Sequence, residues 1–409
     1  MKLTTRLSAG IAALALAALP AIAPAQTQEV KVAVIAPFSG PWARQGDLML
    51  KGAQMAVDDI NAAGGIKALG GAKMKLVVID AGDNIEKAKN AAQRMVAQET
   101  EVIGCTGAWL SSFTLAVTEV TERAELPCLT LSYSDQITAR GFHYIFQTSP
   151  TGDEQAKQAL PTIIQLAQAA TGRAPKNVAI LQDNTAAAVS FAKPMRDGGL
   201  AKAGMNVVVD EIFTPPLSDA TSLIQKVRSA RPDMLFLINT AIPDDKLLVE
   251  KLNEFGLGRG RVPVVANGAH IAAPEVLAAL GKEQVEGIMT VVGNWPITGE
   301  EALLAEYKKR TGEPWMTQET VSTYGDIWIF KEALERAKSA DRKKVAAAIR
   351  ALDLTDGPAR FYPGGRVKFD DKGRRIGAQL VIVQWQNGMP ETVFPPANAT
   401  AKPVWPKQQ

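Results

Sequence analysis

Short apolar runs rich in β-branched residues alternate with amphipathic stretches along the chain from about residue 30 onward. The run 31–36 (KVAVIA) is apolar almost throughout, as a buried strand is, whereas Met55, Ala56 and Ile60 place apolar side chains on one side of a helix. This pattern predicts strands at 31–36, 75–80, 101–105 and 128–131, with helices at 50–60, 85–98 and 112–124. Strands and helices that alternate at this spacing indicate βαβ units and a parallel sheet covered on both faces.

A second series of the same kind follows in the chain. It predicts strands at 177–182, 205–209, 234–239 and 262–266, and helices at 188–203, 219–230 and 244–255. Gly204, Gly256 and Gly281 stand where helices are expected to end, since glycine adopts the left-handed conformation of a helix C-terminus. Further helices at 300–310, 319–338 and 342–352, a strand at 379–385 and a Pro-rich tail from Pro390 complete the pattern. The predicted fold class is α/β, with two doubly wound parallel-sheet lobes.

The first 25 residues have the three regions of a secretory signal peptide. Lys2 and Arg6 form a positive start, 7–19 is an apolar run, and Ala23-Pro24-Ala25 places small residues before a cleavage site. The apolar run is shorter than the roughly 18 residues of a membrane helix, and no later run reaches that length. No cysteine near the site offers a lipid anchor. We therefore expect a soluble periplasmic protein that is exported and cleaved after Ala25.

Composition narrows the possible functions. The chain has 45 basic and 42 acidic residues, a formal charge of +3, which gives no electrostatic footprint for nucleic acid. Its 2 Cys and 2 His are too few for a four-ligand zinc site or an iron–sulfur ligand set. We expect no metal, no cofactor and no nucleic-acid partner.

Catalytic motifs are absent from the sequence. It contains no GxSxG elbow, no HExxH and no P-loop, and the glycines of 256–260 follow a predicted helix instead of a strand. His143 precedes a predicted strand and is interpreted as a structural histidine. His270 follows a strand end, and its position leaves open whether the side chain faces a cleft. These observations predict a protein that is not an enzyme.

The two cysteines are expected to be free. Cys105 ends one predicted strand and Cys128 begins its parallel neighbour, which would place them at opposite ends of the pair. That separation exceeds the roughly 7 Å between Cα atoms that a disulfide allows, although export makes a disulfide chemically possible.

Two polar segments follow neighbouring strands and predict a binding site. Ligands of open parallel sheets bind outside the carboxyl ends of the strands. Trp109, Ser111 and Ser112 follow one strand, and 132–134 (Ser-Tyr-Ser) follow the next. Ser111 or Ser112 is a natural N-cap, and a helix start there offers backbone N–H groups to a carboxylate. The alternative is that these serines only cap a helix and shape a loop.

Several motifs resemble one family along nearly the whole mature chain. The resemblance lies in Ser39-Gly40-Pro41, Asp59-Ile60-Asn61-Ala62-Ala63-Gly64-Gly65-Ile66, Val102-Ile103-Gly104, Leu126-Pro127, Glu286-Gly287, Tyr324 and Phe369-Asp370. On these motifs the chain resembles the Leu/Ile/Val-binding proteins, the type I periplasmic solute receptors of ABC importers.

The resemblance implies two lobes joined by three crossovers that close on a ligand. Carried onto this chain, the first lobe is 26–148 with 293–375, the second is 149–292 with 376–390, and 391–409 is a C-terminal tail. Implied partners are a small-molecule ligand and the membrane subunits of an ABC permease, with the protein itself a monomer. The implied and predicted ligand contacts together are Trp42, Gln45, Trp109, Ser111, Ser112, Ser132, Tyr133, Ser134 and Asn267.

At some positions the sequence differs from the family pattern, and these differences affect which class of ligand we expect. The acidic residue that pairs with a ligand ammonium in the family falls at Asn267-Gly268, where no carboxylate stands, and small residues at 186–188 replace an aromatic side chain. Because an unpaired buried ammonium costs several kcal/mol, we expect a carboxylate ligand without an α-amino group, an aromatic acid above all. The weak point is that Asp183 or Asp219 would replace the missing acid if either reached the cleft. An amino-acid or amide binder is the alternative within the family.

Two other classes compete with a transport receptor. An exported α/β hydrolase would use one of the serines as its nucleophile, but it lacks the elbow and a placed histidine, and turnover of bound ligand would reveal it. A periplasmic receptor for a signalling partner has the same fold, so the fold does not separate it from a transport protein.

Overall fold

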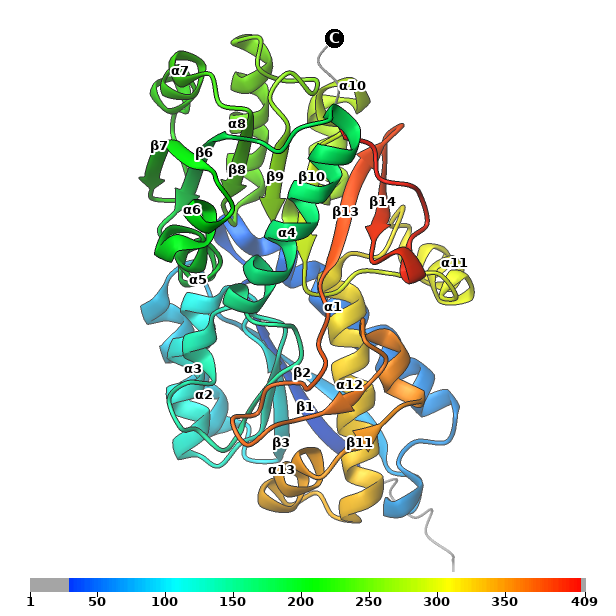
Figure 1. The fold of residues 1–409 in the computed structure, drawn as a ribbon. Helices are drawn as coiled ribbons and strands as arrows, with labels where there is room; N and C mark the ends of the chain where they lie inside the picture. Colours follow the sequence, from blue (N-terminus) through cyan, green and yellow to red (C-terminus); the bar gives the residue numbers. More distant parts are fainter. Residues whose placement is uncertain (1–28, 406–409) are drawn as a thin grey trace, which may run out of the picture.

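The computed structural model describes residues 29–405, so the predicted signal peptide lies outside the described residues. Two lobes lie one above the other, each built around its own sheet with helices on both faces (Figure 1). One hydrophobic core surrounds the sheet of the first lobe, and two cores cover the two faces of the second.

The sheet of the first lobe is parallel, with the strand order β2-β1-β3-β4-β5. Its strands are β1 (Glu29–Ala36), β2 (Lys73–Asp80), β3 (Val102–Gly107), β4 (Cys128–Thr130) and β5 (Ile145–Gln147). The helices of this lobe are α1 (Ala43–Ala62), α2 (Ile85–Gln98), α3 (Ser111–Arg123), α11 (Glu301–Thr311), α12 (Gln318–Ala337) and α13 (Arg342–Arg350). A small ladder of β11 (Asp353–Leu354) and β12 (Val367–Lys368) packs on the same core.

The sheet of the second lobe has the order β14-β13-β10-β9-β8-β6-β7. Its strands are β6 (Asn177–Asp183), β7 (Asn206–Phe213), β8 (Met234–Ile238), β9 (Val264–Asn267), β10 (Met289–Val292), β13 (Val381–Gln386) and β14 (Met389–Phe394). Its helices are α4 (Gly152–Thr171), α5 (Ala186–Pro194), α6 (Leu200–Lys202), α7 (Thr221–Ala230), α8 (Ile242–Glu254), α9 (Pro274–Leu280) and α10 (Lys282–Val285). As expected of a helix end, Gly256 has a positive φ of 71° just after α8.

The C-terminal segment is not the separate tail that the sequence predicts from Pro390. β14 pairs antiparallel with β13 at one edge of the second sheet, and Trp405 is buried against the same lobe. Proline tolerates this place because an edge strand leaves one row of N–H groups without a ladder partner. The edge hairpin is therefore an antiparallel addition to a sheet that is otherwise parallel.

The chain passes between the two sheets after β5, after β10 and before β13. Arg375, on the third passage, is buried and donates from Nε to the carbonyl of Thr148 on the first (2.6 Å) and from Nη1 to the carbonyl of Pro363 (3.0 Å). Burial lowers the pKa of Arg375 to about 10, and the guanidinium takes its partners from backbone carbonyls. The first and third passages are thus held side by side.

The prediction of two free cysteines is wrong. Cys105 lies in the middle of β3, which runs on to Gly107, and its register partner on β4 is Cys128. Their Cα atoms are 4.5 Å apart and the two residues form a disulfide that lies buried between the strands. The error came from ending the strand at Cys105, because the pairing register of two parallel strands is set by packing and not by where each apolar run stops.

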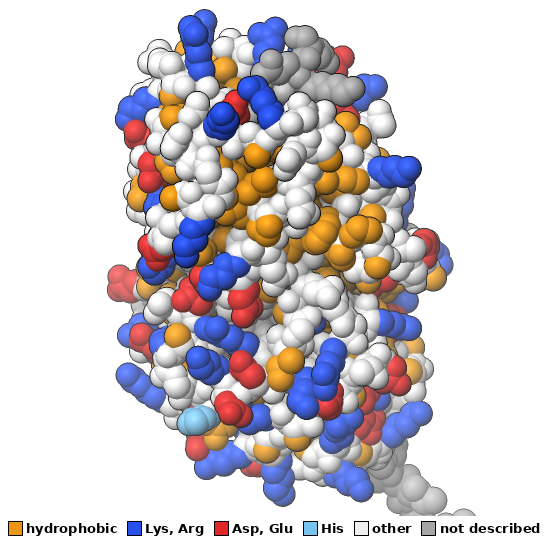
Figure 2. All heavy atoms as spheres, viewed as in Figure 1, with side chains coloured by type: hydrophobic (Ala, Val, Ile, Leu, Met, Phe, Trp, Pro, Cys, Tyr) orange, Lys and Arg blue, Asp and Glu red, His pale blue; other side chains and the backbone are white. Residues whose placement is uncertain are grey.

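Charges of both signs are interspersed over the face of the molecule in Figure 2, in keeping with the nearly balanced composition. Between residues 29 and 405, no helix combines the length and the apolar character that a bilayer span requires.

Candidate ligand-binding site

A cavity of about 410 Å³, including the space at its mouth, lies between the lobes. Its walls are formed where strands of both sheets end and the following helices begin. From the first lobe the lining residues are Trp109, Leu110, Ser111, Leu131, Ser132, Tyr133, Gln318 and Glu319, and from the second they are Ala187, Ala188, Asn239, Thr240, Asn267, Gly268, Ala269 and His270. Carboxyl ends of parallel strands are where open α/β sheets bind ligands.

Ser111 organises the first-lobe wall. It is the first residue of α3, and the preceding Leu110 occupies the N-cap position without a side-chain cap, so the predicted serine N-cap is wrong. The Ser111 hydroxyl instead accepts hydrogen bonds from the N–H groups of Tyr133 and Ser134, both at 3.1 Å. This one buried hydroxyl joins the start of α3 to the loop that follows β4.

Ser132 holds the same two segments together from the other side. Its hydroxyl donates to the carbonyl of Trp109 at 2.7 Å and lies 3.0 Å from the Thr130 hydroxyl. Tyr133 donates its own hydroxyl to Gln318 and accepts the N–H of Gly293 at 2.9 Å. Burial raises the pKa of Tyr133 above its ordinary value, so the phenol is neutral.

Four of the nine predicted contact residues do not line the cavity. The Ser112 hydroxyl accepts the N–H of Ala186 across the lobes at 3.2 Å, and Ser134 caps the short helix η3 (Asp135–Ile137). Trp42 packs edge-on against Phe113, with ring centroids 5.6 Å apart. Gln45 is buried on α1 and its amide has no partner among residues 29–405. The five that do line the cavity are Trp109, Ser111, Ser132, Tyr133 and Asn267.

Glu319 is a lining residue that the sequence did not suggest. It follows Gln318 at the start of α12, about 200 residues along the chain from Trp109, and only 1% of its surface is exposed. Trp109 donates from Nε1 to Glu319 Oε1 at 2.9 Å, and the Thr317 hydroxyl donates to Oε2 at 2.6 Å. The sequence offered an acidic residue in the first turn of a helix, which is common on surface helices and carried no indication of a cleft.

His270 lines the second-lobe wall, which answers the question that its position left open. Its Nδ1 lies 2.6 Å from Asp245 Oδ2 and its Nε2 lies 3.1 Å from the carbonyl of Asn267. Burial alone would lower the pKa of His270, but the Asp245 carboxylate and the hydrogen bonds to Asp245 and Asn267 outweigh burial and raise the pKa to about 9. Both ring nitrogens face acceptors, which suits the imidazolium form.

We expect His270 to stay protonated at neutral pH. A folded-state pKa of about 9, above the ordinary 6.5, makes a stabilising contribution that is complete below about pH 6.5 and is lost as the pH rises through about 9. Because the chain has only 2 His, proton NMR of the imidazole resonances resolves the titration, with a His143→Gln variant for assignment.

Asp245→Asn is the matched change for this titration, since it removes the charge and leaves the shape. We expect it to lower the midpoint of His270 from the wild-type value, because it removes the largest of the influences that raise the pKa, while burial, the Asn267 carbonyl and the Glu319 carboxylate remain. A wild-type midpoint at or below 6.5 would contradict the assignment of an imidazolium.

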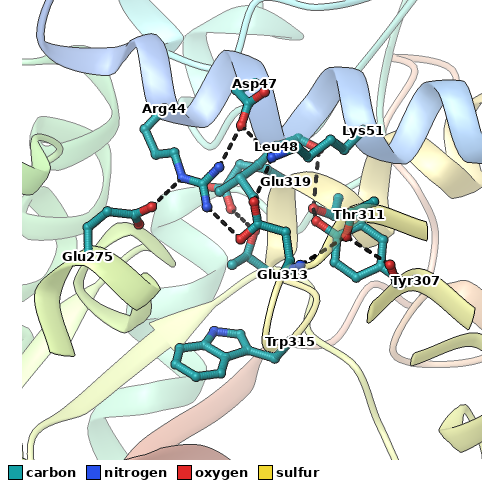
Figure 3. Close-up of polar contacts among 12 residues, drawn as sticks. Arg44, Asp47, Leu48, Lys51, Glu275, Tyr307, Thr311, Glu313, Trp315 and Glu319 are labelled. Carbon is teal, nitrogen blue, oxygen red and sulfur yellow. Dashed lines mark hydrogen bonds and ion pairs between the residues drawn. The ribbon is translucent and has the colours of Figure 1, made fainter. Parts of the chain in front are cut away.

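Polar contacts join the two lobes, and Figure 3 shows the ion pairs around Arg44. Arg44 of α1 lies 2.7 Å from Glu275 of α9 in the other lobe and donates to Glu313 at 2.6 Å, and Lys51 donates to Glu313 at 2.6 Å. The Arg44–Glu275 pair is at ion-pair distance without the angle of a hydrogen bond. Trp315 adds a hydrogen bond from its indole to the carbonyl of Ala272 at 3.1 Å. The two lobes are thus joined by an ion pair and a hydrogen bond.

Within residues 29–405, no cluster of three or more His, Cys, Asp or Glu side chains has the spacing to hold a metal ion. The polar side chains of the cavity wall instead hydrogen-bond one another, as Trp109 does with Glu319 and His270 with Asp245.

Comparisons with known proteins agree with this architecture. A family profile described as "Periplasmic binding protein" matches residues 29–389. The chain is 30% identical over 400 residues to Leu/Ile/Val-binding protein homolog 7 of Brucella melitensis, covering 95% of this chain and 97% of the relative.

Two solved structures share the fold. A leucine binding protein from Thermotoga maritima superposes with a TM-score of 0.75 at 22% identity, over 89% of this chain and 97% of the other. A solute binding protein of an ABC transporter from R. palustris, in complex with 4-hydroxybenzoate, superposes with a TM-score of 0.74 at 22% identity, over 89% and 95%.

Proposed function

Because the chain belongs to the periplasmic binding protein family, we propose that it captures a small organic carboxylate between its two lobes and delivers it to the membrane subunits of an ABC importer. The relatives are solute-binding proteins and not enzymes, in agreement with the absence of catalytic motifs. The observation that carries the proposal is the cavity itself, which takes lining residues from both lobes.

The first-lobe wall supports a carboxylate as the ligand group. At the start of α3 the first N–H groups of the helix have no intrahelical acceptor, and they carry the positive end of the helix dipole. Ser111 lies in this wall and keeps the loop after β4 beside the helix start. A carboxylate placed here would accept hydrogen bonds from the first N–H groups of α3 and would need no Lys or Arg side chain.

Two ligand classes remain in competition within this proposal. An aromatic acid fits the small side chains of Ala187 and Ala188 and the flat face of Trp109, and the R. palustris structure holds 4-hydroxybenzoate. An amino acid fits Glu319, which supplies in the cavity the carboxylate that the sequence comparison found missing at Asn267. The sequence argument against an α-amino group therefore no longer holds.

Calorimetry with leucine, benzoate, 4-hydroxybenzoate and 4-hydroxycinnamate tests the function. We expect at least one of them to bind, and small-angle scattering at saturation to show a smaller radius of gyration than without ligand, since closure buries the ligand between the lobes. Absence of binding by all four, or an unchanged radius with a bound ligand, would count against a closing trap.

Ser111→Ala is expected to weaken the carboxylate that binds by about tenfold or more. The Ser111 hydroxyl accepts the N–H groups of Tyr133 and Ser134, which leaves its own proton for the ligand carboxylate, and a hydrogen bond to a charged group contributes about 1.5–3 kcal/mol. Ser134→Ala is the matched control, because that hydroxyl accepts only from the N–H of Gln136 in η3. Equal affinities for the wild type and Ser111→Ala would show that the carboxylate lies elsewhere.

We also propose that the protein is exported and that its signal peptide is removed. The three regions in residues 1–25 support cleavage after Ala25, so that the mature protein begins at Gln26. The mass of the protein recovered from the periplasm checks this, and a mass that includes Lys2 and Arg6 would refute it.

A further inference from the structure

Five charged side chains gather where the two lobes meet (Figure 3). Four of them belong to the first lobe: Arg44, Asp47 and Lys51 of α1, and Glu313 of the loop after α11. Arg44 donates to Asp47 at 2.5 Å and to Glu313 at 2.6 Å. Lys51 donates to the same two carboxylates, at 2.9 and 2.6 Å. Two cations therefore face two carboxylates, and the first-lobe part of this cluster is balanced in charge by itself.

Glu275 is the fifth member of the cluster, and it comes from α9 of the second lobe. Its Oε1 lies 2.7 Å from Nε of Arg44, which is the one cation within ion-pair distance of it in the described part of the chain. Its Oε2 is buried and accepts no hydrogen bond from any residue between 29 and 405. If the lobes separate, the four first-lobe charges keep one another, whereas Glu275 loses its cation. The attraction between Arg44 and Glu275 therefore acts on the contact between the lobes.

Trp315, in the same loop as Glu313, makes a second contact between the lobes. Its indole donates to the carbonyl of Ala272 at 3.1 Å, and its ring packs edge-on against Trp385 with centroids 5.8 Å apart. The chain continues from Trp315 directly to Gln318 in the first-lobe wall of the cavity. On the other side, the second-lobe wall ends just before Ala272. The contacts between the lobes are thus connected through short pieces of chain to both walls of the cavity.

We propose that Arg44 and Glu275 form an ionic latch that holds the lobes together over a bound ligand and slows its release, and that salt weakens this latch. The inference rests on the proposed function, since it concerns how long the same ligand is retained. The two side chains are 22% and 37% exposed, so dissolved ions screen their attraction. The contacts of Trp315 involve neutral groups and are not screened in this way. Ionic strength therefore acts on the retention of the ligand through the ion pair.

The first experiment measures the rate of ligand release by stopped-flow tryptophan fluorescence. It uses the full mature chain and whichever of leucine, benzoate, 4-hydroxybenzoate and 4-hydroxycinnamate binds. At about 20 mM NaCl we expect Glu275→Gln to release the probe about twofold to fivefold faster than the wild type, as the loss of a partly exposed ion pair implies. At about 500 mM NaCl the wild type should approach the rate of the variant, and the variant itself should change little, because salt then screens the pair.

Glu283→Gln is the matched control, because it removes the same charge from the second lobe without touching the first. Glu283 is 73% exposed and lies 3.7 Å from Arg259 of its own lobe. This control should release the probe at the wild-type rate and respond to salt as the wild type does. Arg44→Gln tests the pairing itself, since in its background Glu275→Gln should change the release rate no further if the two charges act as one unit. Thermal melts establish that each variant is folded.

A measurement without ligand separates the latch from the function on which it rests. Fluorophores on Gln54→Cys in the first lobe and Gln225→Cys in the second, both exposed positions, report the fraction of closed molecules by energy transfer. We expect Glu275→Gln and high salt each to lower this fraction.

The outcomes distinguish failure of the latch from failure of the receptor. Equal release rates for the wild type and Glu275→Gln at low salt, or an equal response of both to salt, would refute the latch and leave the carboxylate receptor standing. If none of the four probes binds, the carboxylate receptor is refuted and the closed fraction decides about the latch. A closed fraction that Glu275→Gln leaves unchanged would then refute the latch as well.

Discussion

Replacing both cysteines, as Cys105→Ala with Cys128→Ala, is expected to lower the free energy of unfolding of the first lobe by about 3 kcal/mol. The disulfide closes a loop with a sequence separation of 23 residues, and a cross-link of that length restricts the unfolded chain by about this amount. The pair lies between two central strands that lead to Ser111 and Ser132, so the loss destabilises the cavity wall as well. Urea unfolding followed by tryptophan fluorescence measures the change.

A reductant provides the control for this prediction. Unfolding of the wild type in the presence of a thiol reductant should move its midpoint toward that of the double variant, because the bond is exposed once the strands separate. The double variant should not respond to the reductant. A double variant as stable as the oxidised wild type would mean that the cross-link does not limit the unfolded chain.

Gly52→Ala is expected to destabilise the first lobe by about 1–2 kcal/mol and to weaken ligand binding. A Cβ at Gly52 would lie 2.2 Å from the carbonyl oxygen of Thr320 and 2.6 Å from the Thr323 hydroxyl, so α1 and α12 would have to move apart. Overpacking of this kind costs about 1–3 kcal/mol or more, which outweighs the gain of about 1 kcal/mol that alanine brings to a helix. The movement would shift Gln318 and Glu319 out of the cavity wall.

Gln54→Ala is the matched control on the same helix. Gln54 is exposed and donates only to Asp58 at 2.8 Å, so we expect a change within about 0.5 kcal/mol. Denaturant midpoints and calorimetry on the two variants check stability and affinity separately. Wild-type stability in Gly52→Ala would contradict the close approach of α1 to α12.

The local pattern of the sequence determined most of the architecture. The strands β1, β2, β6 and β8 and the helices α2, α7 and α8 follow from the local pattern, because short runs rich in β-branched residues favour strands and longer amphipathic stretches favour helices. The family resemblance through 59–66 led to the correct family, and the rule that parallel sheets bind ligands at strand ends led to 109–111 and 132–133, which line the cavity.

The sequence pattern did not predict which residues pair between neighbouring strands or which strand lies at the edge of a sheet. The sequence showed where Cys105 and Cys128 stand in their own apolar runs, but their contact depends on how β3 and β4 align, which packing decides across the whole sheet. β14 was missed for a similar reason, since Pro390 is compatible with a strand only at an edge, and no single-strand pattern reveals which strand is at the edge.

Only the tertiary structure decided which further side chains join the predicted segments in the cavity wall. Glu319, Asn239 and His270 are far apart in the chain and meet because two lobes, each folded around its own sheet, come into contact across the cleft. Trp42 and Gln45 were expected at the ligand because the family resemblance implied that the loop after Gly40-Pro41 covers it, yet the turn of η1 (Gly40–Trp42) into α1 buries both side chains in the first lobe. Sequence periodicity reports which face of an element is buried, whereas the groups that a buried charge meets are set by contacts between elements distant in the chain.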